Sequence, residues 1–353
     1  MSGSRAARRP GPAGELLDLA QGGDEAAFEE LTRPYLRELH LHCYRMLGSF
    51  HDAEDLVQET LLKAWRGLRA FRGDAGVRTW LYRVATNACL DELASSARRF
   101  LPSSLLPASD PDRPEGASGD EPVWLEPYPT RLLDELEGPA AALATRETVE
   151  IAFLAAIQLL SPRERAALLL REVVGFGAEE TAGLLRTTVA SVNSALQRAR
   201  AQVADAGATS KLPARHVATA DELDLVERYV LAFEQADMPS LVRVLCDDIT
   251  MTMPPDPAWF RGRDDVARFL ERWVFGARGP MRGVRADANR QPGLALYERR
   301  DDGRWHGLSL QVLAFDGHAI AEITGFVGTE MFAHFGLKAI SLRVGNKNHG
   351  SGA

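Results

Sequence analysis

Three acidic side chains lie on one face of a predicted helix that begins near Asp52. Asp52, Asp55 and Glu59 are spaced i, i+3 and i+7, which places their carboxylates on the same side of a helix. A row of carboxylates is suited to bind a basic surface of another protein. Carboxylates in a first helical turn also satisfy free N–H groups and oppose the helix dipole, so a structural role for Asp52 and Asp55 is an equal alternative.

A second predicted helix, within residues 77–93, carries a different set of functional groups. Trp80, Arg83 and Asn87 share one face at i, i+3 and i+7. Aromatic rings stack on unpaired bases, and guanidinium and amide groups bind phosphates and base edges, so this combination indicates a nucleic-acid surface. Phe71, just before this helix, fits a core position better than a contact with nucleic acid.

Charge is distributed unevenly along the chain. The 353 residues carry a net charge of −8, which argues against a simple polybasic coat for nucleic acid. Residues 61–100 nevertheless hold eight Lys and Arg against three acids, whereas residues 103–137 hold nine acids against two Arg. A basic patch is therefore followed by an acidic connector.

Cysteine usage and hydropathy indicate an intracellular protein. Cys43, Cys89 and Cys246 are odd in number and widely separated, which argues against a disulfide framework and favours a reducing cytoplasm. No second ligand pair accompanies His40, His42 and Cys43, so no metal site is expected. The basic N-terminus leads into no apolar segment, and no run approaches the ~18 apolar residues of a membrane span. We therefore expect a cytoplasmic protein that does not bind membranes.

Composition and periodicity divide the chain into three folded parts. Two helical segments are separated by a stretch rich in Pro, Ser, Gly and acids, and a third segment begins with helices and ends with two-residue alternation. Trp124, Leu125 and Tyr128 are unusually apolar for a linker, so docking on a neighbouring domain and a loose spacer are equal alternatives for them. The expected parts are a disordered tail (1–13), an all-α domain (14–100), a flexible acidic Pro/Ser-rich linker (101–138), a helix-turn-helix domain (139–206), a spacer (207–217), an α+β domain (218–337) and a loose tail (338–353).

The segment after the linker predicts a helix-turn-helix. Ser161, Pro162 and Glu164 form a strong helix start, and the pattern then gives helices at Ala178–Leu185 and about Val189–Val203. An ordinary surface hairpin has the same periodicity. A helix in the DNA major groove needs small polar side chains near its N-terminus and cations for phosphates. The candidates of these two kinds are Thr188, Ser191, Asn193 and Ser194, and then Arg198 and Arg200.

Two stretches carry a family resemblance. DAEDLVQETLLKAW, followed by F(R)GDAGVRTWLYRVATNACLDEL, resembles region 2 of bacterial RNA polymerase sigma factors, and LSPRERAALLLREVVGFGAEETAGLL…SVNSALQRAR resembles region 4. The chain is thus similar to the small extracytoplasmic-function group of the sigma-70 family, which keeps only these two regions. It departs from the pattern at Asn193 and Ala195, where many members carry Lys and Arg. It also has Arg186 where many have a turn Gly, at a cost of about 1 kcal/mol if the turn requires φ > 0.

The resemblance implies that the chain binds core RNA polymerase and directs promoter-specific initiation. An acidic linker would then suit a basic channel of the polymerase. The residues assigned to core polymerase are Asp52, Asp55, Gln58 and Glu59. The residues assigned to the −10 element are Arg72, Arg78, Trp80, Arg83 and Asn87, and those assigned to the −35 element are the six helix-turn-helix candidates named above.

The last domain resembles the SnoaL-like group of NTF2-like cone folds. Three amphipathic helices precede alternating strands, and the stretch PPDPAWFRGRDDVARFL carries the resemblance. Such cones enclose a pocket, for which Asp256, Trp259 and His306 are the candidate lining residues. None of them, nor His318, belongs to a catalytic motif, so we expect no catalytic residue and no cofactor.

These expectations combine into one hypothesis and two alternatives. The hypothesis is a non-enzymatic sigma factor whose C-terminal domain acts as an intramolecular regulatory or ligand-sensing module. Its expected partners are core RNA polymerase and promoter DNA, with a small-molecule ligand of the last domain and a separate anti-sigma factor left open. The alternatives are a cyclase- or isomerase-type enzyme fused to a DNA-binding module, and a helix-turn-helix regulator that needs no polymerase. The second alternative leaves region 2 without a purpose.

Overall fold

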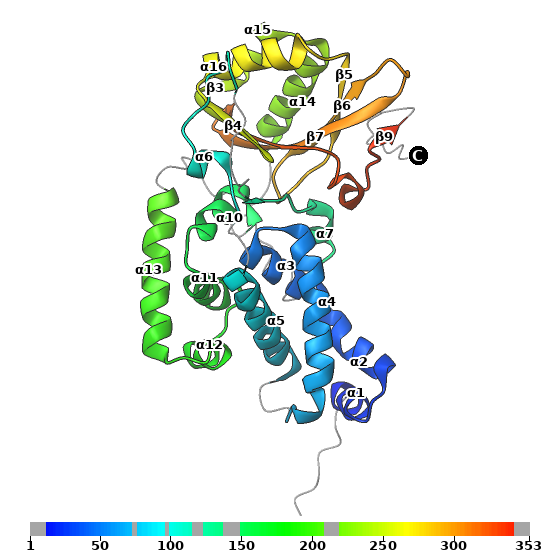
Figure 1. Ribbon diagram of the computed structural model, residues 1–353, viewed down its shortest axis with the longest axis vertical. Coiled ribbons are helices and arrows are strands. Elements are labelled where there is room, and N and C mark those ends of the chain that lie inside the picture. The colour runs from blue at the N-terminus through cyan, green and yellow to red at the C-terminus, as the bar shows by residue number, and fades with distance from the viewer. Residues whose placement is uncertain are drawn as a thin grey trace, which may run out of the picture.

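The computed structural model describes residues 12–72, 76–95, 99–114, 123–136, 149–207 and 219–341. The expectations for the N-terminal tail, the spacer and most of the C-terminal tail fall outside these ranges. Two helical domains lie side by side at one end of an elongated molecule, and the C-terminal sheet domain occupies the other end (Figure 1).

The first helical domain is a bundle whose helices begin at capping side chains. The hydroxyl of Ser49 accepts a hydrogen bond from the backbone nitrogen of Asp52 at 3.0 Å, so Ser49 rather than Asp52 is the N-cap of the long fourth helix. Asp24 caps the second helix through the backbone nitrogen of Ala27. The elements are α1 (Pro12–Gln21), α2 (Glu25–Thr32), a 3₁₀ turn (Arg33–Tyr35), α3 (Leu36–Leu47), α4 (Phe50–Gly67), a second 3₁₀ turn (Leu68–Ala70) and α5 (Gly76–Ser95).

The described parts of the linker are packed against the rest of the molecule. Trp124, Leu125 and Tyr128 are 7%, 2% and 3% exposed, so the docked alternative holds for this apolar segment. Arg99 and Phe100, directly before the linker, also pair in parallel with Val123 and Trp124 of the linker. The elements are β1 (Arg99–Phe100), α6 (Pro102–Leu105), β2 (Val123–Trp124) and α7 (Thr130–Asp134).

The helix-turn-helix domain follows its sequence signals closely. Ser161 and Glu164 form the capping box, with Pro162 in the first turn. Arg186, in the turn between the last two helices, has φ of 51°, so the turn does require the left-handed region and Arg186 occupies it without being glycine. The elements are α10 (Ile151–Gln158), α11 (Pro162–Leu168), a π-helical turn (Leu169–Val173), α12 (Ala178–Leu184) and α13 (Val189–Gly207).

The C-terminal domain has helices first and a mixed sheet afterwards, which confirms the expected α+β architecture. The strand order is β4-β3-β8-β7-β6-β5, antiparallel except for the parallel pair β3–β8. The expected loose tail after residue 337 is partly wrong, because β9 (Ile340–Ser341) pairs with β7. The other elements are α14 (Ala220–Gln235), α15 (Met238–Arg243), β3 (Leu245–Met253), β4 (Asp256–Arg261), α16 (Arg263–Phe269), a π-helical turn (Leu270–Phe275), β5 (Met281–Arg285), β6 (Gly293–Arg299), β7 (Trp305–Asp316), β8 (Ala319–Val327) and a 3₁₀ turn (Phe332–Phe335).

The two faces of this sheet pack against different parts of the chain. On one face Met251, Leu294 and Leu313 belong to the core that the domain forms with its own helices. On the other face Leu310 and Val312 belong to a second core, which continues through the linker and both helical domains. Because successive strand residues point to opposite faces, the sheet separates these two cores. In Figure 1, α7 and α10 lie directly beneath the second face.

None of the helices in the described part of the chain is long and apolar enough to cross a membrane. The same residues contain no group of three or more His, Cys, Asp or Glu side chains arranged to hold a metal ion.

Candidate functional site

The acidic face of α4 is open to solvent over most of its length. Asp55, Gln58 and Glu59 are exposed, and Glu59 forms an i,i+4 ion pair with Lys63 at 2.7 Å. Leu62 lies on the same helix face and is 57% exposed. Protein–protein interfaces combine apolar residues at the centre with polar residues at the rim, and this face of α4 offers both kinds.

Asp52 differs from the other acids of this face because Arg99, at the end of the first domain, binds it. Arg99 donates to the Asp52 carboxylate from Nη2 at 2.8 Å and from Nε at 3.2 Å. The same guanidinium donates to the carbonyl of Trp124 at 3.0 Å and lies 3.7 Å from the carboxylate of Glu126. Arg99 therefore joins α4 to Trp124 and Glu126 of the linker.

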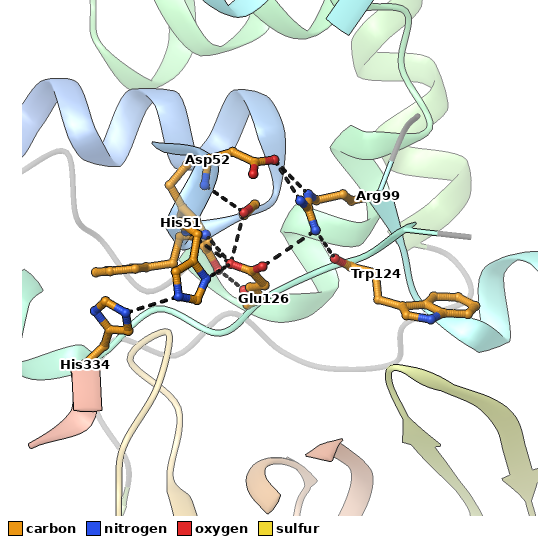
Figure 2. A network of polar contacts seen from close by, with 9 residues as sticks. His51, Asp52, Arg99, Trp124, Glu126 and His334 are labelled. Atoms are coloured by element: carbon orange, nitrogen blue, oxygen red, sulfur yellow. Dashed lines mark hydrogen bonds and ion pairs between the residues drawn. The ribbon is translucent and has the colours of Figure 1, made fainter. Parts of the chain in front are cut away.

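Glu126 of the linker caps the N-terminus of α4 from outside the helix (Figure 2). Its Oε2 accepts hydrogen bonds from the backbone nitrogens of Phe50 at 2.8 Å and His51 at 3.2 Å, and from the hydroxyl of Ser49 at 3.0 Å. These backbone donors have no partner within the helix, and the positive end of the helix dipole also favours a carboxylate there. The linker thus supplies a charge that the first turn of α4 requires.

His334 of the C-terminal domain reaches the same helix end. Its Nε2 lies 3.2 Å from Nε2 of His51, and its ring packs on Phe50 with centroids 4.6 Å apart. Nδ1 of His51 in turn lies 3.1 Å from the Glu126 carboxylate (Figure 2). The N-terminus of α4 therefore contacts the linker and the C-terminal domain at once.

The face of α5 assigned to the −10 element is only partly exposed. Trp80 is 4% exposed and stacks on Phe71 with ring centroids 4.7 Å apart, so the expectation that it is presented to DNA needs correction. The reason is that the ring fills the bundle core. Arg72 and Arg83 are exposed, and the Asn87 amide donates to the carbonyl of Arg83 at 2.8 Å.

Arg78 lies at the contact between the two helical domains. Its guanidinium donates to the buried carboxylate of Glu38, with Nη2 at 2.8 Å. It also lies over the rings of Tyr82 at 5.0 Å and of Phe176 at 5.5 Å, and Phe176 comes from the helix-turn-helix domain. In this arrangement the Arg78 charge is engaged within the chain rather than presented to DNA.

The polar candidates on α13, the predicted recognition helix, are exposed. Thr188 accepts from the backbone nitrogen of Ser191 at 3.2 Å, which places it as the cap of the helix. Arg198 pairs with Glu164 at 2.6 Å, and Arg200 pairs with Glu172. Ser161 and then Arg198 hold the pKa of the Glu164 carboxyl below its usual value. The exposed candidates are Thr188, Ser191, Asn193, Ser194, Arg198 and Arg200.

Asn289, in the loop between β5 and β6, is fully buried where three parts of the chain meet. Its side-chain nitrogen donates to the hydroxyl of Tyr44 at 2.8 Å and to the carbonyl of Val149 at 2.7 Å. Its side-chain oxygen accepts from the backbone nitrogen of Tyr128 at 2.8 Å. The next residue but one, Gln291, accepts from the backbone nitrogen of Ile151 at 2.9 Å. This loop connects the first helical domain, the linker and the start of the helix-turn-helix domain.

The three pocket candidates of the C-terminal domain lie apart. Asp256 is exposed at the start of β4, where its carboxylate accepts from the backbone nitrogen of Ala258. Trp259 is buried because the linker covers it, and its indole donates to the carbonyl of Leu106 at 2.9 Å. His306 pairs with Asp302 on β7, which β3 and β8 separate from β4.

Sequence reasoning missed Leu62, Glu126 and Asn289. Leu62 had a signal, because it is a large apolar residue outside the helical stripe that the neighbouring apolar residues form. Glu126 is one of nine acids in its segment, and nothing in its spacing distinguishes it. Asn289 has φ of 56°, a conformation that Asn tolerates better than most residues, but its partners are more than a hundred residues away.

Comparisons with known proteins identify the two helical domains. A family model described as Sigma-70 region 2 matches residues 31–99, and one described as Sigma-70, region 4 matches residues 150–203. The ECF RNA polymerase sigma factor SigG of Mycobacterium tuberculosis is 41% identical over 314 residues, which cover 88% of this chain and 84% of SigG.

Two further proteins are similar to this chain, one over about half of its length and one over most of it. The RNA polymerase sigma-H factor of Pseudomonas aeruginosa is 33% identical over 186 residues, which cover 53% of this chain and 89% of that protein. The crystal structure of the Mycobacterium tuberculosis extracytoplasmic function sigma factor SigJ has a similar fold, with a TM-score of 0.56 at 23% identity. That match covers 89% of this chain and 100% of the SigJ chain.

Proposed function

The chain belongs to the extracytoplasmic-function group of sigma-70-family RNA polymerase sigma factors, which direct transcription initiation, and from this premise we propose that its C-terminal domain is an intramolecular brake. The brake holds regions 2 and 4 together and is released before the protein engages a promoter. Region 2 is the first helical domain and region 4 is the helix-turn-helix domain.

The buried Asn289 carries this proposal. Its side chain makes three hydrogen bonds, to Tyr44 of region 2, to Tyr128 of the linker and to Val149 at the start of region 4. A buried hydrogen bond contributes about 1 kcal/mol net, and an unpaired buried amide costs more than that. One side chain of the C-terminal domain thus stabilises the packed arrangement of all three other parts.

The geometry of promoter DNA supports the need for an open form. The −10 and −35 elements are separated by about 25 base pairs, or about 85 Å of duplex at about 3.4 Å per pair. Two domains of the size of regions 2 and 4 span about 60 Å when they touch, by the usual scaling of domain radius with length. The contact of Arg78 with Phe176 shows that the two regions touch in this structure. Simultaneous binding of both elements therefore requires that they separate.

We propose a binding partner for each exposed surface. The face of α4 that carries Asp55, Gln58 and Glu59 binds core polymerase, with Leu62 as its apolar centre. Arg72, Arg83 and Asn87 contact the −10 element. The exposed residues of α13 contact the −35 element, and Arg198 and Arg200 exchange their internal carboxylates for phosphates. Movement of region 4 removes the contact of Arg78 with Phe176, and movement of the linker removes the contacts of Arg99, the partner of Asp52, with Trp124 and Glu126.

A sigma factor is a transcription factor and not an enzyme, and no observation favours catalysis by the C-terminal domain. Its candidate acid Asp256 is exposed and lies on a different strand from His306. A ligand of this domain and a separate anti-sigma factor remain predictions. Because the protein acts together with core polymerase, we place it in the cytoplasm.

The test uses the full chain with Asn289→Gly, which removes the three side-chain hydrogen bonds and keeps a residue that tolerates φ of 56°. We expect loss of about 3 kcal/mol from the closed arrangement. Reconstituted transcription with core polymerase, on templates from a randomised promoter library, should therefore rise, and the radius of gyration in solution should increase. The control is Gln235→Ala, a substitution of an exposed side chain at the end of α14. Unchanged initiation together with a larger radius would refute the brake.

A further inference from the structure

A cavity of about 380 Å³ lies where the linker, region 4 and the C-terminal sheet meet. Its walls are Ser103 and Ser104 of α6, Ala152 and Ala155 of α10, and a floor formed by β3, β4 and β8. This volume lies within the range of sites that bind small molecules. The sheet face that forms this floor is turned toward the sigma regions. The opposite face packs on the helices of the C-terminal domain.

The strand register explains why the floor of the cavity is polar. Thr250 is paired with Glu322 and Thr252 with Thr324 across β3 and β8, and Thr250 is paired with Arg261 across β3 and β4. Residues paired in register point to the same face of a sheet. A patch of hydroxyl groups with one carboxylate therefore lies opposite the alanines of α10.

Two groups of this floor lack a partner within the described chain. Thr252 is 3% exposed, and its hydroxyl has no hydrogen-bond partner among the described residues. Glu322 lines the cavity, is partly exposed, and forms no ion pair with any described residue. Burial, followed by the nearby charge of Glu150, raises the pKa of the Glu322 carboxyl. A buried polar group without a partner is costly, so both groups are suited to receive one from a ligand.

We infer that this cavity binds a small organic cation, an amine whose ammonium group meets Glu322 and Thr252 and whose apolar body packs on Ala152 and Ala155. An ammonium group has only hydrogen-bond donors, and carboxylate and hydroxyl oxygens accept them. An anionic ligand would face Glu322 and the charge of Glu150. The guanidinium of Arg261 lies over the ring of Trp259 at 5.3 Å and is exposed, so it belongs to the rim.

This inference rests on the proposed brake in one respect. The walls come from three parts of the chain that separate when the brake is released, so a bound amine favours the closed form by its differential affinity. Binding itself is measured on the full chain without polymerase. If Asn289→Gly fails to open the protein but the amine binds, the brake is wrong and the cation site stands.

The experiment compares three probes of similar shape and different charge by isothermal titration calorimetry. The probes are 2-phenylethylamine, 2-phenylethanol and 3-phenylpropionate. We expect affinity to fall in that order. Glu322→Gln should weaken the amine about ten-fold or more and leave the alcohol unchanged, because it removes one charge-assisted hydrogen bond. The matched control is Glu227→Gln, the same change on the exposed side of α14.

A second variant fills the cavity without changing charge. Ala155→Phe should abolish binding of both the amine and the alcohol, and circular dichroism and thermal unfolding show whether each variant is folded. If Ala155→Phe does not fold, the comparison of Glu322→Gln with the wild type alone tests whether the cavity binds the amine. Preference for 3-phenylpropionate, absence of amine binding at millimolar concentration, or an equal amine affinity in the wild type and Glu322→Gln would overturn the inference.

Discussion

The carboxylate of Glu126 lies 2.8 Å from the backbone nitrogen of Phe50, so a linker residue caps the helix that carries the proposed polymerase-binding face. The cap of α4 and the docking of the linker are therefore one set of contacts. A change at Glu126 must affect the stability of region 2 and the closed arrangement together.

Glu126→Ala is expected to lower the free energy of unfolding by about 1–2 kcal/mol, the usual effect of losing a charged helix cap. It should also raise polymerase-dependent initiation, because the linker is released. Glu135→Ala removes an acid from the same linker whose partners, Arg37 and Arg131, are on the surface. That control should change neither quantity measurably. If Glu126→Ala lost stability without any gain in initiation, Glu126 would cap α4 but would not contribute to the brake.

Leu62→Ala should weaken binding to core polymerase with little effect on stability, since the side chain is 57% exposed. Truncation of an apolar centre of an interface typically costs about 1–2 kcal/mol of binding free energy. Asp55→Arg should weaken the same binding by reversing a charge. Leu231→Ala is matched in exposure, at 55%, on α14 of the C-terminal domain. Equal effects of the two leucine variants on polymerase affinity would place the interface elsewhere.

Substitutions of Trp80 and Arg83 are expected to affect different properties of the protein, namely folding stability and DNA binding. Trp80→Ala should cost about 3–5 kcal/mol of folding stability, because it empties a core position stacked on Phe71. Arg83→Ala should leave stability nearly unchanged and weaken binding to a single-stranded −10 oligonucleotide in the presence of polymerase. Urea unfolding and fluorescence anisotropy measure the two effects. A stable Trp80→Ala protein would contradict the buried position.

Arg198→Ala should weaken binding to −35 duplexes of every sequence and reduce the slope of log affinity against log salt by about one. Asn193→Ala should instead relax preference for a particular base, because an amide can bind a base edge. Anisotropy titrations over a salt series with a randomised −35 library distinguish them. If Arg198→Ala instead weakened binding only to duplexes with a particular base, the assignment of phosphate contact to Arg198 and base contact to Asn193 would be wrong.

Stability should fall as pH falls below 6.5 because of His42. Burial, followed by the charges of Arg45 and Arg78, lowers the pKa of His42 to about 3. Below pH 6.5 the unfolded chain therefore binds a proton that the folded chain does not, and the stability present above pH 6.5 is lost at up to about 1.4 kcal/mol per pH unit. His42→Gln should reduce this slope in urea unfolding between pH 7 and 5. His318→Gln, at an 89% exposed side chain, should leave the slope unchanged.

Local signals in the sequence predicted the parts of the fold that short-range contacts determine. The capping box of Ser161 and Glu164, the two helices of the helix-turn-helix and the positive φ at Arg186 all depend on neighbours within a few residues. The burial of Trp80 depends instead on which face of α5 the bundle covers, and Asn289 depends on partners up to 245 residues away. Periodicity gives no access to such partners, so the closed arrangement was beyond prediction from spacing.

The core beneath the C-terminal sheet runs without interruption into region 2, the linker and region 4. The protein is consequently not a set of interchangeable modules. A C-terminal domain transplanted onto another sigma factor would carry its own helix-side core intact, but it would expose the apolar face of β7 unless the recipient supplied a matching α10 and linker. Inheritance of this C-terminal domain should therefore require that the linker and the adjoining surface of region 4 change together with it.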